Sequence, residues 1–260
     1  AMIAAEPNGG RLYVTHPEFG KISVIDGGLL GAPKQFEVSG TPFGVAASSD
    51  GRLFVTDWNR DLLLVLDGRT GAKIAAIGVG KSPANVVVSA LNKRAFVTNR
   101  EDDSVSVIDT DRLLVIATVG VGRAPFALAI SPDENRIYVA NAQSSDVSVL
   151  SADSLERLGT VRVGAMPYGV AVTPEGETLF VANQQSGSVF AVDTRSLVVT
   201  DRIKVGRYPE AIVMHPDGHK AYVVNWMSGD ISVLNVKGGE EIKRLPAGDG
   251  IRGLAIMASG

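Results

Sequence analysis

The feature that most constrains the fold of this chain is an internal repeat. An aromatic residue, a valine, a small or β-branched residue and a polar residue recur with their aromatic members 41 or 42 residues apart. The six copies are Tyr13–His16, Phe54–Asp57, Phe96–Asn99, Tyr138–Asn141, Phe180–Asn183 and Tyr222–Asn225. A period this regular indicates one supersecondary unit that is stacked many times.

Each repeat predicts four short strands. One repeat serves as the pattern, with strands expected at Phe126–Ser131, Arg136–Ala140, Asp146–Leu150 and Leu158–Val163. The third of these alternates apolar and small polar residues, as a half-buried strand does. Turn residues such as Pro132-Asp133 separate the strands, and no segment keeps a helical period of about 3.6 residues.

About 42 residues with four strands is the size of one propeller blade. A closed ring of blades covers both faces of every sheet, which an isolated blade cannot do. We therefore expect an all-β chain, a single β-propeller domain over residues 1–260 with six four-stranded blades. The alternative has seven blades, because Met2–Ala5 and Gly253–Met257 both resemble the innermost strand; part of one blade then lies outside the sequence given.

The repeats resemble those of the YVTN β-propeller family, which includes surface-layer and YncE-like propellers. Phe96-Val97-Thr98-Asn99 is the nearest match to the family tetrapeptide, and Ser104–Thr110 and Val119–Gly122 also fit. The resemblance implies the fold and no particular activity, since propellers host many functions. Two repeats depart from the pattern, with His16 and Asp57 in the place of the asparagine.

Composition excludes several kinds of site. The chain has no cysteine, which removes disulfides, thiolate metal sites and cysteine nucleophiles. The net charge of −3 gives no general attraction for nucleic acid, and no apolar run approaches the roughly 20 residues of a membrane helix. Ala1–Gly10 does not read as a signal peptide. The family resemblance implies a periplasmic or cell-surface protein whose signal segment has been removed.

Residues that recur between repeats predict structural roles. Aspartates end the third strand, where a short carboxylate can accept backbone N–H groups of the next turn; they are Asp26, Asp67, Asp109 and Asp193. Asparagines in the repeated tetrapeptide are expected to tie neighbouring loops; they are Asn99, Asn141, Asn183 and Asn225.

Residues that vary between repeats are the candidates for function. They lie before the innermost strand and after the second strand, in loops that we expect to share one face. Aromatic residues beside arginines are typical of binding surfaces, where they stack on planar groups and pair with anions. The predicted ligand-binding residues are Trp58, Arg60, Arg100, Arg123, Tyr168, Gln184, Arg207, Tyr208, Trp226 and Arg252.

Catalytic and metal motifs are absent from the sequence. There is no phosphate-binding loop, no HExxH and no GxSxG motif. His215 and His219 flank a Pro-Asp-Gly turn, so their spacing of four residues does not place them on one helix face. No metal or cofactor is predicted.

The function expected from these observations is a non-catalytic binding or scaffold propeller, whose loop face takes a protein partner or a small anionic or planar ligand. The alternative is a periplasmic enzyme with a central pocket, lactonase-like or like a dehydrogenase subunit, in which His16, Glu18 and Glu210 would act. Only that alternative would bring a tetrapyrrole or a metal. A purely structural repeat is the third possibility, and the sequence leaves the ligand and the oligomeric state open.

Overall fold

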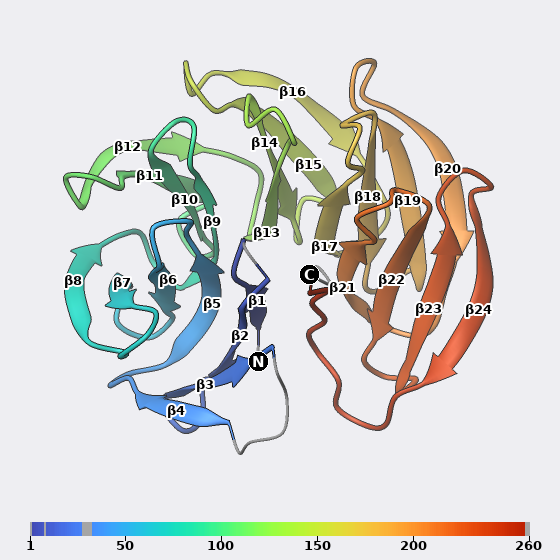
Figure 1. The fold of residues 1–260 in the computed structure, drawn as a ribbon. Coiled ribbons are helices and arrows are strands. Elements are labelled where there is room, and N and C mark those ends of the chain that lie inside the picture. The colour runs from blue at the N-terminus through green and yellow to red at the C-terminus, as the bar shows by residue number, and fades with distance from the viewer. Residues whose placement is uncertain (1, 8, 28–32, 258–260) are drawn as a thin grey trace. The chain divides into compact units, whose positions relative to one another are not determined.

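A computed structural model describes residues 2–7, 9–27 and 33–257 of the chain (Figure 1). All regular elements of the described residues are β-strands, and they form six antiparallel sheets of four strands each. The expected fold class, a six-bladed β-propeller, is therefore confirmed. The chain divides into two compact units, unit 1 with Ala1–Gly120 and Ala255–Gly260 and unit 2 with Val121–Leu254. That residues 1–260 form a single domain stays a prediction.

Unit 1 holds blades 1 to 3. Blade 1 contains β1 (Ile3–Ala5), β2 (Arg11–His16), β3 (Lys21–Asp26) and β4 (Lys34–Glu37). Blade 2 contains β5 (Pro42–Ala47), β6 (Arg52–Asp57), β7 (Leu62–Asp67) and β8 (Lys73–Gly78). Blade 3 contains β9 (Pro83–Ser89), β10 (Arg94–Asn99), β11 (Ser104–Asp109) and β12 (Leu114–Gly120).

Unit 2 holds blades 4 to 6. Blade 4 contains β13 (Pro125–Ile130), β14 (Arg136–Asn141), β15 (Asp146–Ser151) and β16 (Arg157–Arg162). Blade 5 contains β17 (Pro167–Val172), β18 (Thr178–Asn183), β19 (Ser188–Asp193) and β20 (Val198–Lys204). Blade 6 contains β21 (Pro209–Met214), β22 (Lys220–Asn225), β23 (Asp230–Asn235) and β24 (Glu240–Pro246).

The count of first strands decides between six and seven blades. Met2–Ala5 was expected to be an innermost strand, and β1 covers most of it and pairs with β2. Gly253–Met257, the expected seventh copy, forms no strand. Within the described residues, each first strand thus belongs to its own four-stranded sheet. The expectation of six blades is confirmed.

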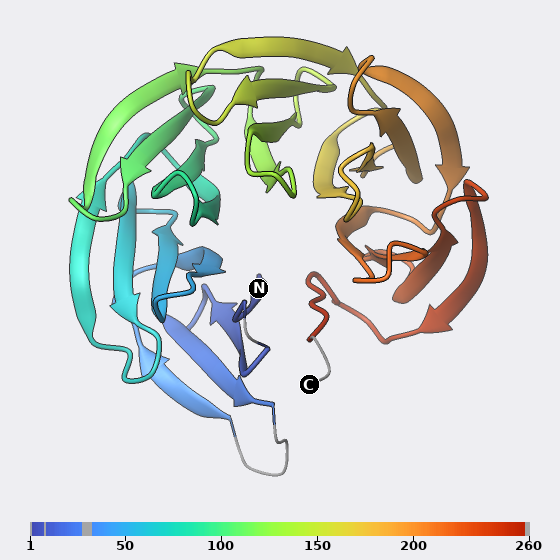
Figure 2. The same ribbon diagram turned by 45° about the horizontal axis from the view of Figure 1, so that its top comes forward.

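Neighbouring blades of one unit pack face to face. In unit 2 the first strands β17 and β21 lie side by side, as do the fourth strands β20 and β24 (Figures 1 and 2). In unit 1 a single apolar cluster joins Tyr13 and Ile22 of blade 1 to Val55 and Leu66 of blade 2. Burying an apolar side chain of this size stabilises the fold by about 1.5–3 kcal/mol, so contact between blades is a main source of stability.

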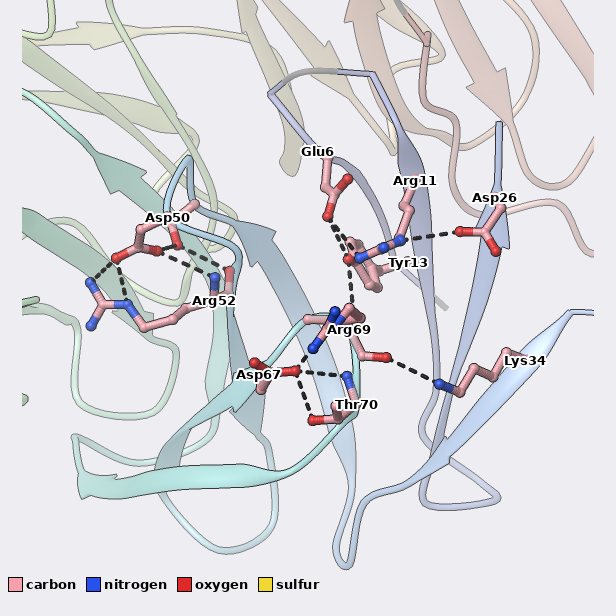
Figure 3. Close-up of polar contacts among 12 residues, drawn as sticks. Glu6, Arg11, Tyr13, Asp26, Lys34, Asp50, Arg52, Asp67, Arg69 and Thr70 are labelled. Atoms are coloured by element: carbon pink, nitrogen blue, oxygen red, sulfur yellow. Dashed lines mark hydrogen bonds and ion pairs between the residues drawn. The ribbon is translucent and has the colours of Figure 1, made fainter. Parts of the chain in front are cut away.

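Polar groups tie one blade to the next. The Tyr13 hydroxyl donates to the Gly68 carbonyl at 3.0 Å and lies 2.8 Å from a carboxylate oxygen of Glu6 (Figure 3). Desolvation by burial raises the pKa of Tyr13 to about 12, so this hydroxyl stays a donor at neutral pH. A similar hydrogen bond joins blades 2 and 3, where Arg52 Nη1 donates to the Thr110 carbonyl at 2.6 Å.

Three of the four recurring aspartates, Asp67, Asp109 and Asp193, accept backbone N–H groups of the following turn, as the sequence predicted. Asp67 Oδ1 accepts the Thr70 hydroxyl and the N–H of Thr70, both at 2.7 Å, and also the N–H of Arg69 (Figure 3). These bonds, led by the one from the Thr70 hydroxyl, lower the pKa of Asp67. Asn99 accepts the Gly80 N–H at 3.1 Å, which joins two neighbouring blades. Among the described residues, the Oδ1 atoms of Asn141, Asn183 and Asn225 are buried without a hydrogen-bond partner, so the asparagines join neighbouring loops through Oδ1 only at Asn99.

Candidate functional site

The two variable loops of each blade lie together. The residue after the second strand donates its N–H to a carbonyl just before the first strand of the same blade, as in Trp58 to Thr41 and Trp226 to Tyr208. The same bond joins Gln184 to Met166. With the equivalent bonds from Arg100 to Ser82 and from Ala142 to Ala124, the two loops lie together in each of blades 2 to 6, and we call that part of a blade its loop end. That the loops of all blades share one face stays a prediction.

A buried carboxylate organises the loop ends of unit 2. Glu210 is the second residue of β21 and only 6% of its surface is exposed. Gln184 Nε2 donates to Glu210 Oε1 at 3.0 Å, and Arg252 Nη1 donates to the two carboxylate oxygens at 3.1 and 3.3 Å. A buried carboxylate is tolerable only when it is paired in this way.

Aromatic side chains complete this group. The Arg252 guanidinium lies over the Trp226 ring, with its central carbon 4.3 Å from the ring centroid. Tyr208 packs edge-on against Trp226 at a centroid distance of 6.0 Å. The Arg252 side chain remains 43% exposed. We call Gln184, Tyr208, Glu210, Trp226 and Arg252 the Arg252 cluster.

Two opposing effects set the charge of the cluster. Burial raises the pKa of Glu210, while the positive charge of Arg252 and the hydrogen bond from Gln184 lower it by less. Glu210 therefore takes up a proton at a higher pH than an ordinary glutamate. Deprotonated, it neutralises Arg252; protonated, it leaves the cluster with the full positive charge of the guanidinium.

The remaining predicted residues of unit 2 lie outside these contacts. Tyr168 stacks on Phe126 with ring centroids 3.7 Å apart. Arg207 Nη2 donates to the Met227 carbonyl at 3.2 Å, so part of its hydrogen-bonding capacity is used locally. Arg123 is exposed. A role in ligand binding for these three residues stays a prediction.

Unit 1 has a different arrangement. Trp58 packs on Phe43 at 4.8 Å between centroids, and the Arg100 guanidinium lies 5.9 Å from its ring centroid. Arg60 Nε donates to the fully buried Asp57 at 2.6 Å, and its Nη2 also donates to the Ser39 carbonyl. Arg60 thus compensates the aspartate that replaces the usual asparagine, which the sequence did not suggest.

The residues of the enzyme alternative are divided between the units. His16 Nε2 lies 2.8 Å from the Ser23 hydroxyl, and Glu18 is exposed; both belong to unit 1, whereas Glu210 belongs to unit 2. Across the described part of the chain, no group of three or more His, Asp or Glu side chains is placed to hold a metal ion. No described helix is long and apolar enough to cross a membrane.

The repeat period contains a signal for the Arg252 cluster that sequence reasoning missed. Phe126, Tyr168, Glu210 and Arg252 follow one another at intervals of 42 residues and occupy the same place in the repeat. Side chains at successive copies of this place touch, because Phe126 stacks on Tyr168 and Glu210 pairs with Arg252. Comparing each residue with the one 42 positions later would have predicted both contacts.

Comparisons with solved structures show the same fold. The hydrazine synthase of Kuenenia stuttgartiensis has a TM-score of 0.88 at 18% identity, over 97% of this chain and 88% of that chain. Streptogramin B lyase has a TM-score of 0.84 at 15% identity, over 97% and 85%. A functionally unknown protein from Desulfotomaculum acetoxidans has a TM-score of 0.80 at 19% identity, over 92% and 80%.

Sequence comparison adds a family match. The family model of the YncE-like beta-propeller matches residues 84–215, just over half of the 260 residues. No curated protein sequence matches the chain. The solved structures, all below 20% identity, support the fold and leave the chemistry of the loop ends to be argued from this chain.

Proposed function

Because the chain belongs to the YncE-like β-propeller family, a family of repeats that carries no single chemistry, we propose that it is a binding protein. The Arg252 cluster is its proposed site, and a small planar anion is its proposed ligand. The observation that carries the proposal is a partly exposed guanidinium held over the Trp226 ring by the buried carboxylate of Glu210.

The geometry supports an anion because the arginine is held in place before a ligand arrives. Glu210 engages Nη1 of Arg252, and the described contacts engage none of its other guanidinium nitrogens. A guanidinium presents five N–H donors in a fixed plane, so donors remain for a carboxylate, sulfonate or phosphate group. Holding the side chain in place beforehand reduces the entropy lost on binding.

Planarity of the ligand follows from the aromatic side chains. Trp226 and Tyr208 offer ring surfaces that favour offset or edge-on contacts with another ring. An anionic group attached to a flat ring would use the guanidinium and the indole together. A flexible aliphatic anion would use the guanidinium alone.

Benzenesulfonate is the probe that tests the site, because it is planar and stays ionised at every pH used. The chain has two tryptophans, so Trp58→Phe leaves Trp226 as the reporter of fluorescence. We expect benzenesulfonate to quench Trp226 saturably. Arg252→Ala in the same background should weaken binding by at least about tenfold, as expected when a charged hydrogen bond worth 1.5–3 kcal/mol is lost.

Three controls make the result specific. Cyclohexanesulfonate keeps the charge without the flat ring, and benzyltrimethylammonium keeps the ring with the opposite charge; both should bind more weakly. Trp226→Phe leaves Trp58 as reporter and should show no saturable quenching. Quenching that is linear in probe, or that survives Arg252→Ala unchanged, would reject the proposed site.

A catalytic role for Glu210 is the second candidate function. A buried carboxyl group with a raised pKa is suited to general acid or base chemistry. A panel of simple lactones and esters tests it with the wild-type chain and Glu210→Gln. Turnover that Glu210→Gln removes while benzenesulfonate still binds would favour the enzyme, and no turnover in either protein would reject a hydrolase.

Export to the periplasm or the cell surface is part of the proposal and is supported by the family resemblance alone. Fractionating cells that carry the native gene, with a cytoplasmic marker enzyme as control, tests it. Recovery of the protein with the cytoplasmic marker would reject this location.

A further inference from the structure

A hollow lies in unit 1, beside the loop end of blade 3. It is a cleft of about 590 Å³ between the end of the fourth strand of blade 2 and the face of blade 3. The backbone of residues 78–80 forms one wall, and Asp102, Ser104, Ser106 and Thr118 contribute side chains. Its volume lies within the roughly 300–1,000 Å³ of ligand sites.

The repeat shows that the fold does not require this cleft. Counting in steps of 42 residues, Arg202 in blade 5 and Arg244 in blade 6 correspond to Thr118 in blade 3. The Arg202 guanidinium lies 5.1 Å from the centroid of Phe190, which has the place of Ser106. Arg244 pairs with Glu241 at 2.8 Å. A large side chain therefore occupies the place of Thr118 in blades 5 and 6, and in blade 5 also the place of Ser106.

Two glycines keep the cleft open. A Cβ atom added at Gly78 or Gly120 would meet no atom within 4 Å. The places that correspond to Gly120 carry Arg162 in blade 4 and Lys204 in blade 5. Neither glycine has a positive φ, so the backbone does not require glycine there and the open space is a property of this pair of blades.

The floor of the cleft consists of hydroxyl groups that are held in place. Asn99 Nδ2 donates to Ser104 Oγ at 3.0 Å and to Ser106 Oγ at 2.9 Å. Because both hydroxyl oxygens accept from Asn99, each serine proton remains to be donated to another acceptor. Asn99 is itself fixed by the Gly80 N–H, and both serines are buried.

The rim supplies an acceptor and no positive charge. One carboxylate oxygen of Asp102 accepts the Lys81 N–H at 2.8 Å, which holds the side chain at the cleft and leaves its other oxygen for a ligand. Among the residues that line the cleft no side chain is cationic. A fitting ligand must donate to Asp102, accept from the serines and carry no negative charge.

We propose that this cleft binds a neutral polyhydroxylated ligand, one or two sugar units in size. Each sugar hydroxyl both donates and accepts, which matches a carboxylate beside hydroxyl donors, and Val79 and Val115 offer an apolar wall to the C–H groups of the ring. This site rests on different residues from the Arg252 cluster and does not depend on the proposed function.

Saturation-transfer difference NMR with maltose and with glucose tests the proposal on the full chain. We expect transfer to sugar protons in the wild type. Thr118→Arg, which copies blades 5 and 6, should reduce it at least fivefold. Gly120→Arg, which copies blade 4, should do the same, and circular dichroism and thermal melting check that both variants are folded.

Two further variants make the outcome decisive. Thr160→Arg adds the same charge at the corresponding exposed place of blade 4 and should keep the signal. Arg252→Ala should also keep it, which separates this site from the Arg252 cluster. No transfer to either sugar in the wild type, or transfer that a folded Thr118→Arg retains in full, would overturn the proposal.

Discussion

Trp58 and Trp226 occupy the same place in blades 2 and 6, yet their surroundings differ. The residue after the first proline of the blade is Phe43 in blade 2 and Glu210 in blade 6. Phe43 packs directly on Trp58, and Arg100 stays at 5.9 Å from the ring. Glu210 instead holds Arg252 at 4.3 Å from Trp226.

The comparison teaches that a tryptophan near an arginine can have very different partners in two blades of the same fold, and a ligand-binding role for Trp58 and Arg100 stays a prediction. In blade 2 the aromatic pair is a packing contact, and no ion pair of Arg100 with a buried carboxylate is found among the described residues. In blade 6 the acidic residue Glu210 fixes Arg252, which has the same place in the next repeat, whereas Ala84 has that place after blade 2. The following predictions exchange or weaken these features, beginning with the largest expected effect.

Phe43→Glu gives blade 2 the residue of blade 6 and should cause the largest loss of stability. The substitution removes the Phe43–Trp58 contact and adds a carboxylate to a blade whose next repeat has Ala84 in the place of Arg252. We expect a loss of about 2 kcal/mol in the free energy of unfolding, since Phe43 is only half-buried. Urea unfolding measures it, and Phe43→Leu should lose less than half as much.

Arg252→Ala breaks the pair in blade 6. It leaves the buried carboxylate of Glu210 with only the Gln184 amide, which is unfavourable, but the exposure of Arg252 limits the loss to about 1 kcal/mol at neutral pH. Glu210→Gln in addition removes the charge and should recover much of that loss. A double variant that is less stable than Arg252→Ala alone would contradict a charged Glu210.

The pH dependence of stability follows from the raised pKa of Glu210. The folded chain holds this proton more tightly than the unfolded chain does, so the stabilisation is complete below the ordinary glutamate pKa. It is lost as the pH rises through the raised value. Arg252→Ala should move this loss to still higher pH, and Glu210→Gln should remove it. Urea unfolding at a series of pH values measures the pH at which each of the three proteins loses this stability.

Arg100→Ala should have the smallest effect. At 5.9 Å from the ring the cation–π contribution of Arg100 is about 0.5 kcal/mol or less. Stability should change little, and the fluorescence of Trp58 in a Trp226→Phe background should shift slightly. A loss as large as that of Arg252→Ala would mean that the two arginines are equivalent, contrary to the comparison.

The fold was predictable because the same four-strand pattern occurs six times in the sequence. Every blade has the same four strands, and the expected strand at Leu158–Val163 differs from β16 by one residue at each end. The end of the chain was harder to predict. Gly253–Met257 has the pattern of a first strand, but a strand also needs partners, and a sequence pattern does not show whether they exist.

The site was predictable in its residue types and not in its pairings. Aromatic residues and arginines were expected at the loop ends, and the structure joins Trp226 and Arg252 there. Arg60 was expected to serve a ligand, and the structure pairs it with the buried Asp57, so its role toward a ligand stays a prediction. Local partners compete with ligands for arginine donors, and those partners depend on loop geometry that residue spacing alone does not give.

Isothermal titration of benzenesulfonate tests the central claim most directly, because it measures binding without relying on either tryptophan. The wild-type chain should bind the probe, and more tightly below the pKa of Glu210, where no carboxylate charge offsets that of Arg252, than above it. Arg252→Ala should release no measurable heat of binding. Equal affinity on both sides of that pKa together with equal affinity in Arg252→Ala would contradict the account.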